Sequence, residues 1–262
     1  MDLFQAFLLG ALQGVTEFLP ISSSGHLVLG EHFLGLNVES LKTFDVAVHV
    51  GTLLAIFVYF RVEILNLIKA LGKLCCGKKD KDVMMLNYII IGTIPAVFAG
   101  LFLEDFIDGL FRNITAVATW MMIVAIFFVL GERFFRIHGS SKFTWPKALI
   151  IGLAQMVALV PGVSRSGSTI VAGLFVGMKR EEAARFSFLL GSPAIFGAGL
   201  LKGLEVFKSG VHIDFAPMAV GFISAFIFGM VSVWGLMKFL KNHSLIVFAA
   251  YLAAIGSFVL FL

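Results

Sequence analysis

Long runs of apolar residues follow one another along this chain, with short polar segments between them. Six runs are close to the roughly 20 residues that a helix needs to cross a membrane. These six runs cover residues 44–60, 84–103, 115–131, 186–201, 215–237 and 244–262. Four other runs are paired around polar interruptions: 3–19 with 27–36, and 148–163 with 169–178. The pattern predicts an all-α polytopic membrane protein with six transmembrane helices and two re-entrant helical hairpins.

The composition agrees with this prediction. Hydrophobic residues make up 59% of the 262 positions, charged residues make up 14%, and the mean hydropathy is +0.99. A soluble domain of this length does not reach such values. The net charge of +4 comes from the loops and indicates membrane topology, not nucleic-acid binding. We therefore expect membrane lipids around a single membrane domain, residues 1–262.

The two polar interruptions repeat one pattern. Residues 13–25 read QGVTEFLPISSSG, and residues 155–167, which lie 142 positions later, read QMVALVPGVSRSG. Backbone that leaves the helix at membrane depth has no water to pair with, so it survives where it lines a cavity or a site. Two such interruptions in matching positions of two halves indicate a binding site at a repeat interface.

The repeat extends beyond these interruptions into the expected spans. Small residues recur four positions apart in two of them: Gly92, Ala96 and Gly100, and then Gly221, Ala225 and Gly229. Each set places a smooth stripe on its helix, which suits close helix packing. We predict two halves, about 1–137 and 145–262, each with one hairpin and three spans. Because three crossings are an odd number, the two halves form an inverted-topology repeat.

The positions of Lys and Arg predict the orientation. Most of the 20 basic residues fall in four segments, 61–82, 133–147, 179–185 and 238–241. By the positive-inside rule these segments are cytoplasmic loops. Both termini then lie outside, the first hairpin enters from outside, and the second enters from the cytoplasm. We therefore expect the tips of the two hairpins to meet near the membrane midplane.

The first hairpin carries a carboxylate inside an apolar run. Gln13 and Glu17 are one helical turn apart, so they share a face. A charge at membrane depth is costly, which makes Glu17 a candidate functional residue. The alternative is a neutral carboxylic acid, or an ion pair with Arg165 that only holds the two halves together.

Three hydroxyls and an imidazole follow in the same hairpin: Ser22, Ser23, Ser24 and His26. We expect a Ser here to cap the next helix, whose free N–H groups suit an anion. Imidazole ionises near neutral pH, which suits proton transfer. The alternative is a simple turn with a capped helix, in which His26 is only hydrogen bonded.

The second hairpin supplies a guanidinium among hydroxyls: Ser164, Arg165, Ser166 and Thr169. Arg165 offers five donors in a fixed fork that matches phosphate oxygens. Thr169 lies four residues further on and is expected to face the same point. The combined set suits hydrolysis of a phosphate ester or anhydride, and it suits transport of an anion almost as well.

Other charged residues lie toward the expected outer side. Asp45 and His49 share a face at the outer end of a span, and we attribute them to hydration at the membrane interface. Glu104, Asp105 and Asp108 make the next outer loop acidic, and a solvated face is the expected explanation.

The two motifs resemble those of a known family. QGVTEFLPISSSGH followed by PGVSRSGST is similar to the bacterial undecaprenyl-diphosphate phosphatases, also called bacitracin-resistance proteins. The similarity covers both motifs at full length and extends along the chain. It implies hydrolysis of undecaprenyl diphosphate to undecaprenyl phosphate and phosphate, which recycles the lipid carrier for peptidoglycan synthesis and confers bacitracin resistance. The alternative is a transporter or flippase of polyprenyl phosphate or of another anion.

The resemblance also implies roles for individual residues. The catalytic candidates are Glu17, Ser23, His26 and Arg165. The residues expected to bind the phosphates of the polyprenyl diphosphate are Ser22, Ser24, Ser164, Arg165, Ser166 and Thr169. The nucleophile is either Ser23, with His26 as its base, or a water molecule activated by Glu17 or His26.

The family further implies a cofactor and a location. Its members need a divalent cation, magnesium or calcium, and its metal-binding pair corresponds to Gln13 and Glu17. Many relatives have Glu where this chain has Gln13, and an amide offers no charge and cannot act as a base. The site is expected to face outside, toward the periplasm, from a bacterial inner (plasma) membrane. Family members are often dimers, so a homodimer is among the expected states.

Overall fold

The computed structural model describes residues 1–36, 41–78, 80–138, 141–209 and 214–261. Some helical side chains lie outside this description: Lys42, Glu104, Asp105, Asp108, Arg136, Ile137, His138, Lys202, Glu205, Val206, Phe207 and Ser209. The expected acidic face of 104–108 therefore lies outside the described side chains.

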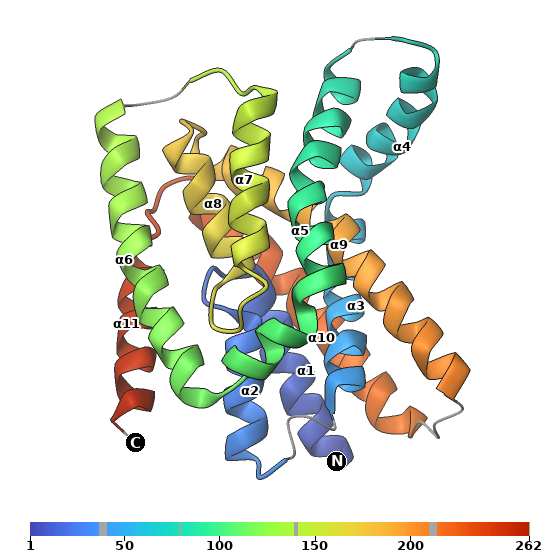
Figure 1. Cartoon of the computed structure of the whole chain (residues 1–262), viewed down its shortest axis with the longest axis vertical. Helices are drawn as coiled ribbons and strands as arrows, with labels where there is room; N and C mark the ends of the chain where they lie inside the picture. The colour runs from blue at the N-terminus through green and yellow to red at the C-terminus, as the bar shows by residue number, and fades with distance from the viewer. Residues whose placement is uncertain (37–40, 79, 139–140, 210–213, 262) are drawn as a thin grey trace.

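The regular structure of the described residues is α-helical (Figure 1). The helices are α1 (Leu3–Phe18), α2 (Ser23–Phe33), α3 (Lys42–Tyr59), α4 (Arg61–Cys75), α5 (Lys81–Phe111), α6 (Ile114–His138), α7 (Trp145–Val157), α8 (Arg165–Phe175), α9 (Arg180–Ser209), α10 (Phe215–Phe239) and α11 (Ile246–Leu260). Stretches of α5, α6, α9 and α10 are long and apolar enough to cross a membrane, and the bent pair α3–α4 makes a fifth candidate span. The predicted all-α integral membrane architecture is confirmed. Because α11 has only 15 residues, the number of six crossings stays a prediction.

The predicted loop at 61–82 is wrong over most of its length. Residues 61–75 form α4, which turns by 87° from α3. Ala70 and Leu67 of α4 pack against Val83 and Leu86 of α5. Tertiary burial of this apolar face stabilises a helix that basic residues had marked as a loop. The helix α5 also continues to Phe111, beyond the predicted end at residue 103.

Each of the two expected hairpins is present as a helix, a break and a second helix. In the first, Ser22 adopts a left-handed conformation with φ 72°, and its Oγ accepts a hydrogen bond from the Gly25 N–H. In the second, Ser164 accepts from the Gly167 N–H at 3.1 Å. Both second helices therefore begin with a serine N-cap, which the sequence analysis predicted for the first hairpin only.

Close glycine contacts bring each hairpin against a long helix. A Cβ at Gly10 of α1 would overlap the backbone of Gly221 in α10. A Cβ at Gly152 of α7 would likewise overlap the backbone of Gly92 in α5. Backbones this close leave room for hydrogen only. The two contacts join equivalent repeat positions, while the boundaries of the two halves stay a prediction.

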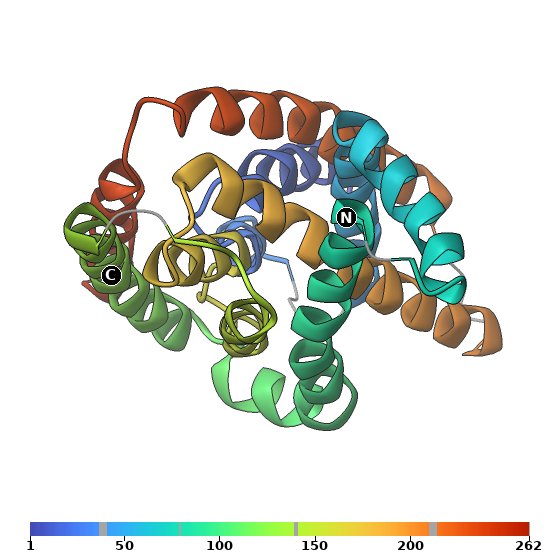
Figure 2. The ribbon, with the colours of Figure 1, turned by 90° about the horizontal axis from the view of Figure 1, so that it is seen from above.

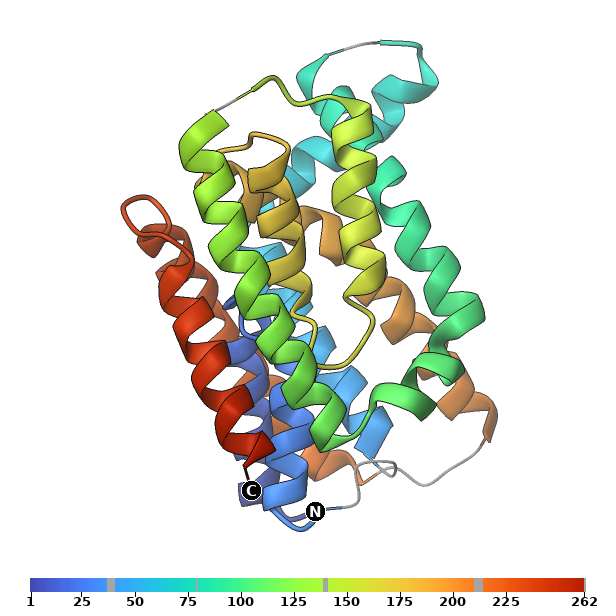
Figure 3. The ribbon, with the colours of Figure 1, turned by 60° about the vertical axis from the view of Figure 1, so that its left-hand side comes forward.

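The hairpins enter from opposite ends of the molecule and meet in its middle. The hairpin α1–α2 comes from the end that carries both termini, and α7–α8 comes from the other end (Figures 1 and 3). Seen from above, α2 and α8 lie near the centre, with α5, α6, α10 and α11 around them (Figure 2). This arrangement places the polar breaks of both hairpins inside the helical bundle.

Candidate functional site

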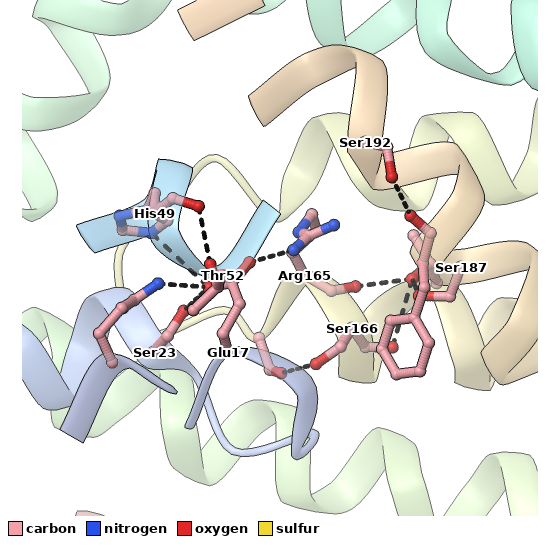
Figure 4. A network of polar contacts seen from close by, with 12 residues as sticks. Glu17, Ser23, His49, Thr52, Arg165, Ser166, Ser187 and Ser192 are labelled. Carbon is pink, nitrogen blue, oxygen red and sulfur yellow. Dashed lines mark hydrogen bonds and ion pairs between the residues drawn. The ribbon is translucent and has the colours of Figure 1, made fainter. Parts of the chain in front are cut away.

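An ion pair joins the two hairpins where their tips meet. Glu17 in the last turn of α1 pairs with Arg165, the first residue of α8 (Figure 4). Their side chains are 3% and 18% exposed. Removing one partner of a buried ion pair leaves the other charge uncompensated. The ion pair between Glu17 and Arg165, which the sequence analysis gave as one alternative, is therefore present. It holds the two breaks at one depth.

The two oxygens of the Glu17 carboxylate have different partners. Oε1 accepts from Arg165 Nη2. Oε2 accepts from Ser23 Oγ at 2.7 Å and from Gln13 Nε2 at 2.8 Å. Glu17 is thus the common acceptor for a guanidinium, a hydroxyl and an amide. The structure thus brings together four of the predicted residues, Glu17 and its three hydrogen-bond partners.

His26 has other partners. Its Nδ1 lies 2.7 Å from the carbonyl oxygen of Ser22, and its Nε2 lies 2.8 Å from the hydroxyl of Tyr251 in α11. Because a carbonyl only accepts, Nδ1 carries the hydrogen, and Nε2 of the neutral ring accepts from Tyr251. The two rings also stack, with centroids 5.7 Å apart. The structure therefore pairs Ser23 with Glu17 and not with His26.

Hydroxyls of the second tip form hydrogen bonds to the first break and to α9. Ser166 Oγ donates to the carbonyl oxygen of Leu19, in the first break, at 3.2 Å. Thr169 Oγ1 donates to the carbonyl oxygen of Arg165 at 2.8 Å and lies 2.6 Å from Ser187 Oγ of α9. Thr169 is 1% exposed, so it holds α8 against α9 instead of sharing the ligand point of Arg165.

The structure places at the site a residue that the sequence analysis attributed to interface hydration. His49 Nε2 lies 3.7 Å from Glu17 Oε2 (Figure 4). Its neighbour on the same face, Asp45, is buried and ion-paired with Arg112. The hydration prediction was therefore wrong for Asp45, whereas the His49 side chain is 27% exposed and also faces the site. A polar pair one helical turn apart in an apolar span indicates a functional site for the same reason as Gln13 and Glu17, because polar side chains at membrane depth are costly.

Two polar atoms at the site are buried without a hydrogen-bond partner in the described structure. They are Arg165 Nη1, a donor, and Gln13 Oε1, an acceptor. Gly191 of α9 makes room for the first, because a Cβ at this position would overlap Nη1. A buried polar atom without a partner is costly, so these two atoms are candidates for ligand contacts.

The donor set suits a cation that is shared with a substrate. Among the described residues, no three His, Cys, Asp or Glu side chains form a metal-binding group. Magnesium, however, is commonly held by one or two carboxylates, with substrate phosphates and waters completing its shell. Glu17 and the free amide oxygen of Gln13 provide such a partial shell. The residues present therefore fit a divalent cation that binds together with a phosphorylated ligand.

A buried carboxylate, guanidinium and hydroxyls at the breaks of two opposed helical hairpins define an integral membrane protein with an internal site for an anionic group. The chain belongs to the family described as Bacitracin resistance protein BacA, which matches residues 6–258. The family resemblance of the two motifs is thereby confirmed.

Proteins named undecaprenyl-diphosphatase are similar to the chain over nearly its whole length. The one from Trichlorobacter lovleyi is 44% identical and covers 98% of this chain and 95% of its own. The one from Rubrobacter xylanophilus is 42% identical, with 99% and 97% covered. The one from Desulforapulum autotrophicum is 40% identical, with 98% and 96% covered.

Proposed function

We propose that this protein is a membrane phosphatase that hydrolyses undecaprenyl diphosphate to undecaprenyl phosphate and inorganic phosphate. The observation that carries the proposal is Glu17, which binds a hydroxyl on one oxygen and a guanidinium on the other. The whole-length similarity to proteins named undecaprenyl-diphosphatase supports this substrate. The reaction recycles the lipid carrier for peptidoglycan synthesis and confers bacitracin resistance. The same similarity disfavours a pure transporter or flippase.

Arg165 binds the terminal phosphate. Its Nη1 is free of other partners, and its guanidinium fork matches two phosphate oxygens. The first N–H groups of α2 and α8 have no helical acceptor and add donors, as do the hydroxyls of Ser22, Ser24 and Ser164. Ser166 and Thr169 support this set by fixing the second tip. The polyprenyl tail remains among the apolar helices and lipid.

Ser23 acts as the nucleophile, and Glu17 is its base. Ser23 Oγ attacks the terminal phosphorus while Glu17 Oε2, 2.7 Å away, accepts the hydroxyl proton. The bond between this phosphorus and the bridging oxygen breaks, and its electron pair leaves with undecaprenyl phosphate. Water then hydrolyses the phosphoserine and restores the hydroxyl. In the alternative route, Glu17 activates a water molecule directly, and a failed phosphoenzyme trap would favour that route.

His26 is a positioning residue in this proposal. Its hydrogen bonds to the Ser22 carbonyl and to Tyr251 fix the first turn of α2 against α11. That turn begins with Ser23, so His26 controls where the nucleophile lies. This role replaces the predicted role of His26 as the base for Ser23.

A divalent cation, magnesium or calcium, completes the proposed site. Glu17 and Gln13 would hold it, together with oxygens of the diphosphate. When bound, the cation neutralises charge that develops on the phosphate oxygens.

The site faces outside, toward the periplasm, from the bacterial plasma membrane. The distribution of basic residues supports this orientation, because the loops richest in them lie at the end opposite the termini (Figure 1). The same proposal includes an inverted arrangement of the two halves and assembly as a homodimer.

The test is phosphate release from undecaprenyl diphosphate by the purified protein, with magnesium, with calcium and with a chelator. Arg165→Ala and Glu17→Ala are compared with His32→Gln, a matched control because His32 is exposed near the end of α2. We expect cation-dependent release that both site variants lose and the control retains. No release from a folded wild-type protein would overturn the phosphatase proposal.

A further inference from the structure

We propose that His49 is a third protein ligand of the divalent cation, beside Glu17 and Gln13. The site is then a mixed nitrogen and oxygen site, which suits calcium less well than a shell made of oxygen alone. This inference rests on the proposed function, because the cation is the one that assists phosphate transfer. It concerns a residue outside the two hairpins, on α3.

The hydrogen bond of His49 selects the tautomer that a metal ligand needs. Its Nδ1 lies 2.7 Å from the carbonyl oxygen of Asp45, and because a carbonyl only accepts, Nδ1 carries the hydrogen. The lone pair of the neutral ring is then on Nε2, the nitrogen that faces Glu17. Histidines that bind metals commonly donate their other ring N–H to a carbonyl in this way, which fixes both tautomer and orientation.

The support behind His49 is itself rigid. Asp45 is buried and ion-paired with Arg112, which holds this turn of α3 in place. Thr52 Oγ1 donates to the carbonyl oxygen of His49 at 2.8 Å. The ring is therefore oriented before any cation arrives, and no rearrangement of α3 is needed for binding.

The spacing suits two ligands of one ion. The 3.7 Å between His49 Nε2 and Glu17 Oε2 is longer than a hydrogen bond. It falls in the range of roughly 3 to 4 Å that separates two ligands whose bonds to one cation are about 2.0–2.3 Å long. Gln13 donates its Nε2 to the same Oε2 and keeps its Oε1 free. The imidazole of His49 and the amide group of Gln13 therefore both lie beside Oε2 of Glu17.

The opposite oxygen of Glu17 belongs to Arg165. A cation on the His49 side of Oε2 and a guanidinium at Oε1 would flank the carboxylate, and a phosphate could contact both positive groups. Oε2 would keep Ser23 as its hydrogen-bond donor, as the proposed proton transfer requires. The two charges then do not compete for one position.

The chemistry of the donors predicts the preference between ions. Magnesium and calcium favour shells made of oxygen alone, whereas imidazole nitrogen suits transition metals. A shell with His49 Nε2, Glu17 and an amide oxygen therefore discriminates against calcium. The competing explanation is that protonated His49 only forms an ion pair with Glu17 and binds no cation.

Manganese is the probe that separates these explanations, because its electron spin reports on bound nitrogen. Mn²⁺ binding to the full-length purified protein is titrated by electron paramagnetic resonance, and ¹⁴N coupling is measured by pulsed methods. We expect saturable binding with imidazole ¹⁴N coupling in the wild type. His49→Gln should lose the coupling and bind Mn²⁺ about ten-fold more weakly or worse. His32→Gln, the exposed control, should match the wild type.

A second measurement covers the case in which His49→Gln does not fold. Wild-type protein grown with ¹⁵N-histidine should replace the ¹⁴N coupling with that of ¹⁵N. Mn²⁺ bound without histidine coupling, coupling that survives in folded His49→Gln, or no saturable binding would each overturn the inference. Phosphate release is measured in parallel, with and without chelator, so that failure of the His49 inference can be told from failure of the proposed function. Release without any cation would leave the phosphatase proposal standing. No release under any condition would overturn the phosphatase proposal.

Discussion

Gly191→Ala is predicted to displace the guanidinium of Arg165, although the substitution itself replaces no residue assigned to the chemistry. A Cβ at this position would overlap Arg165 Nη1 and lie 2.7 Å from its Cζ. Ordinary contacts between carbon atoms are about 3.5–4.0 Å, so Cζ has to move by roughly 1 Å. A misplacement of about 1 Å can lower a reaction rate by about 100-fold. That loss corresponds to about 2.7 kcal/mol of transition-state stabilisation.

The effect on folding is expected to be smaller than the effect on activity. Ala is favoured over Gly inside a helix by up to about 1 kcal/mol, which stabilises α9. Breaking a buried ion pair by deleting one partner costs about 3–5 kcal/mol, and this is an upper bound here. Arg165 is retained, and its side chain is 18% exposed and can turn toward water.

The assay is kcat/KM for phosphate release, with the thermal midpoint measured on the same preparations. Gly197→Ala is the matched control, because it lies in the same helix and a Cβ there meets nothing within 4 Å. We expect a loss of about 100-fold for Gly191→Ala and wild-type activity for Gly197→Ala. A folded Gly191→Ala protein within about three-fold of wild-type activity would refute the placement of Arg165 against α9.

Three further predictions follow from single contacts. Tyr251→Phe leaves Nε2 of His26 without its donor, so the free energy of unfolding should fall by about 1–3 kcal/mol in chemical denaturation; no change would mean that water replaces the hydroxyl. Gly10→Ala should prevent or strongly weaken folded-protein recovery in detergent, because the overlapping atom is backbone that cannot turn aside, while Gly235→Ala, with nothing within 4 Å, should behave as wild type. Gln13→Glu adds a carboxylate, so it should tighten Mn²⁺ binding and lower phosphate release in chelator; weaker Mn²⁺ binding would contradict the placement of the cation.

Local sequence determined the class of the protein and the two hairpins. Apolar runs and helix-breaking Pro and Gly act over a few neighbouring residues, so the existence of both breaks could be predicted without a fold. The first break was placed to within one residue of Phe18, whereas the second was expected after residue 163 and begins after Val157. The same reasoning failed at residues 61–75. Basic residues marked this segment as a loop, and its helix depends on packing against α5.

Only the tertiary structure decided which side chains meet. Glu17 and Arg165 are 148 positions apart, and His26 and Tyr251 are 225 positions apart. Periodicity places a side chain on a face of its own helix but does not say what lies opposite that face. His49 was visible in the sequence as a polar residue in an apolar span, yet its meaning came from the carboxylate that α1 places 3.7 Å away. Helix formation is local, whereas a polar site depends on side-chain positions that the packing of distant helices sets.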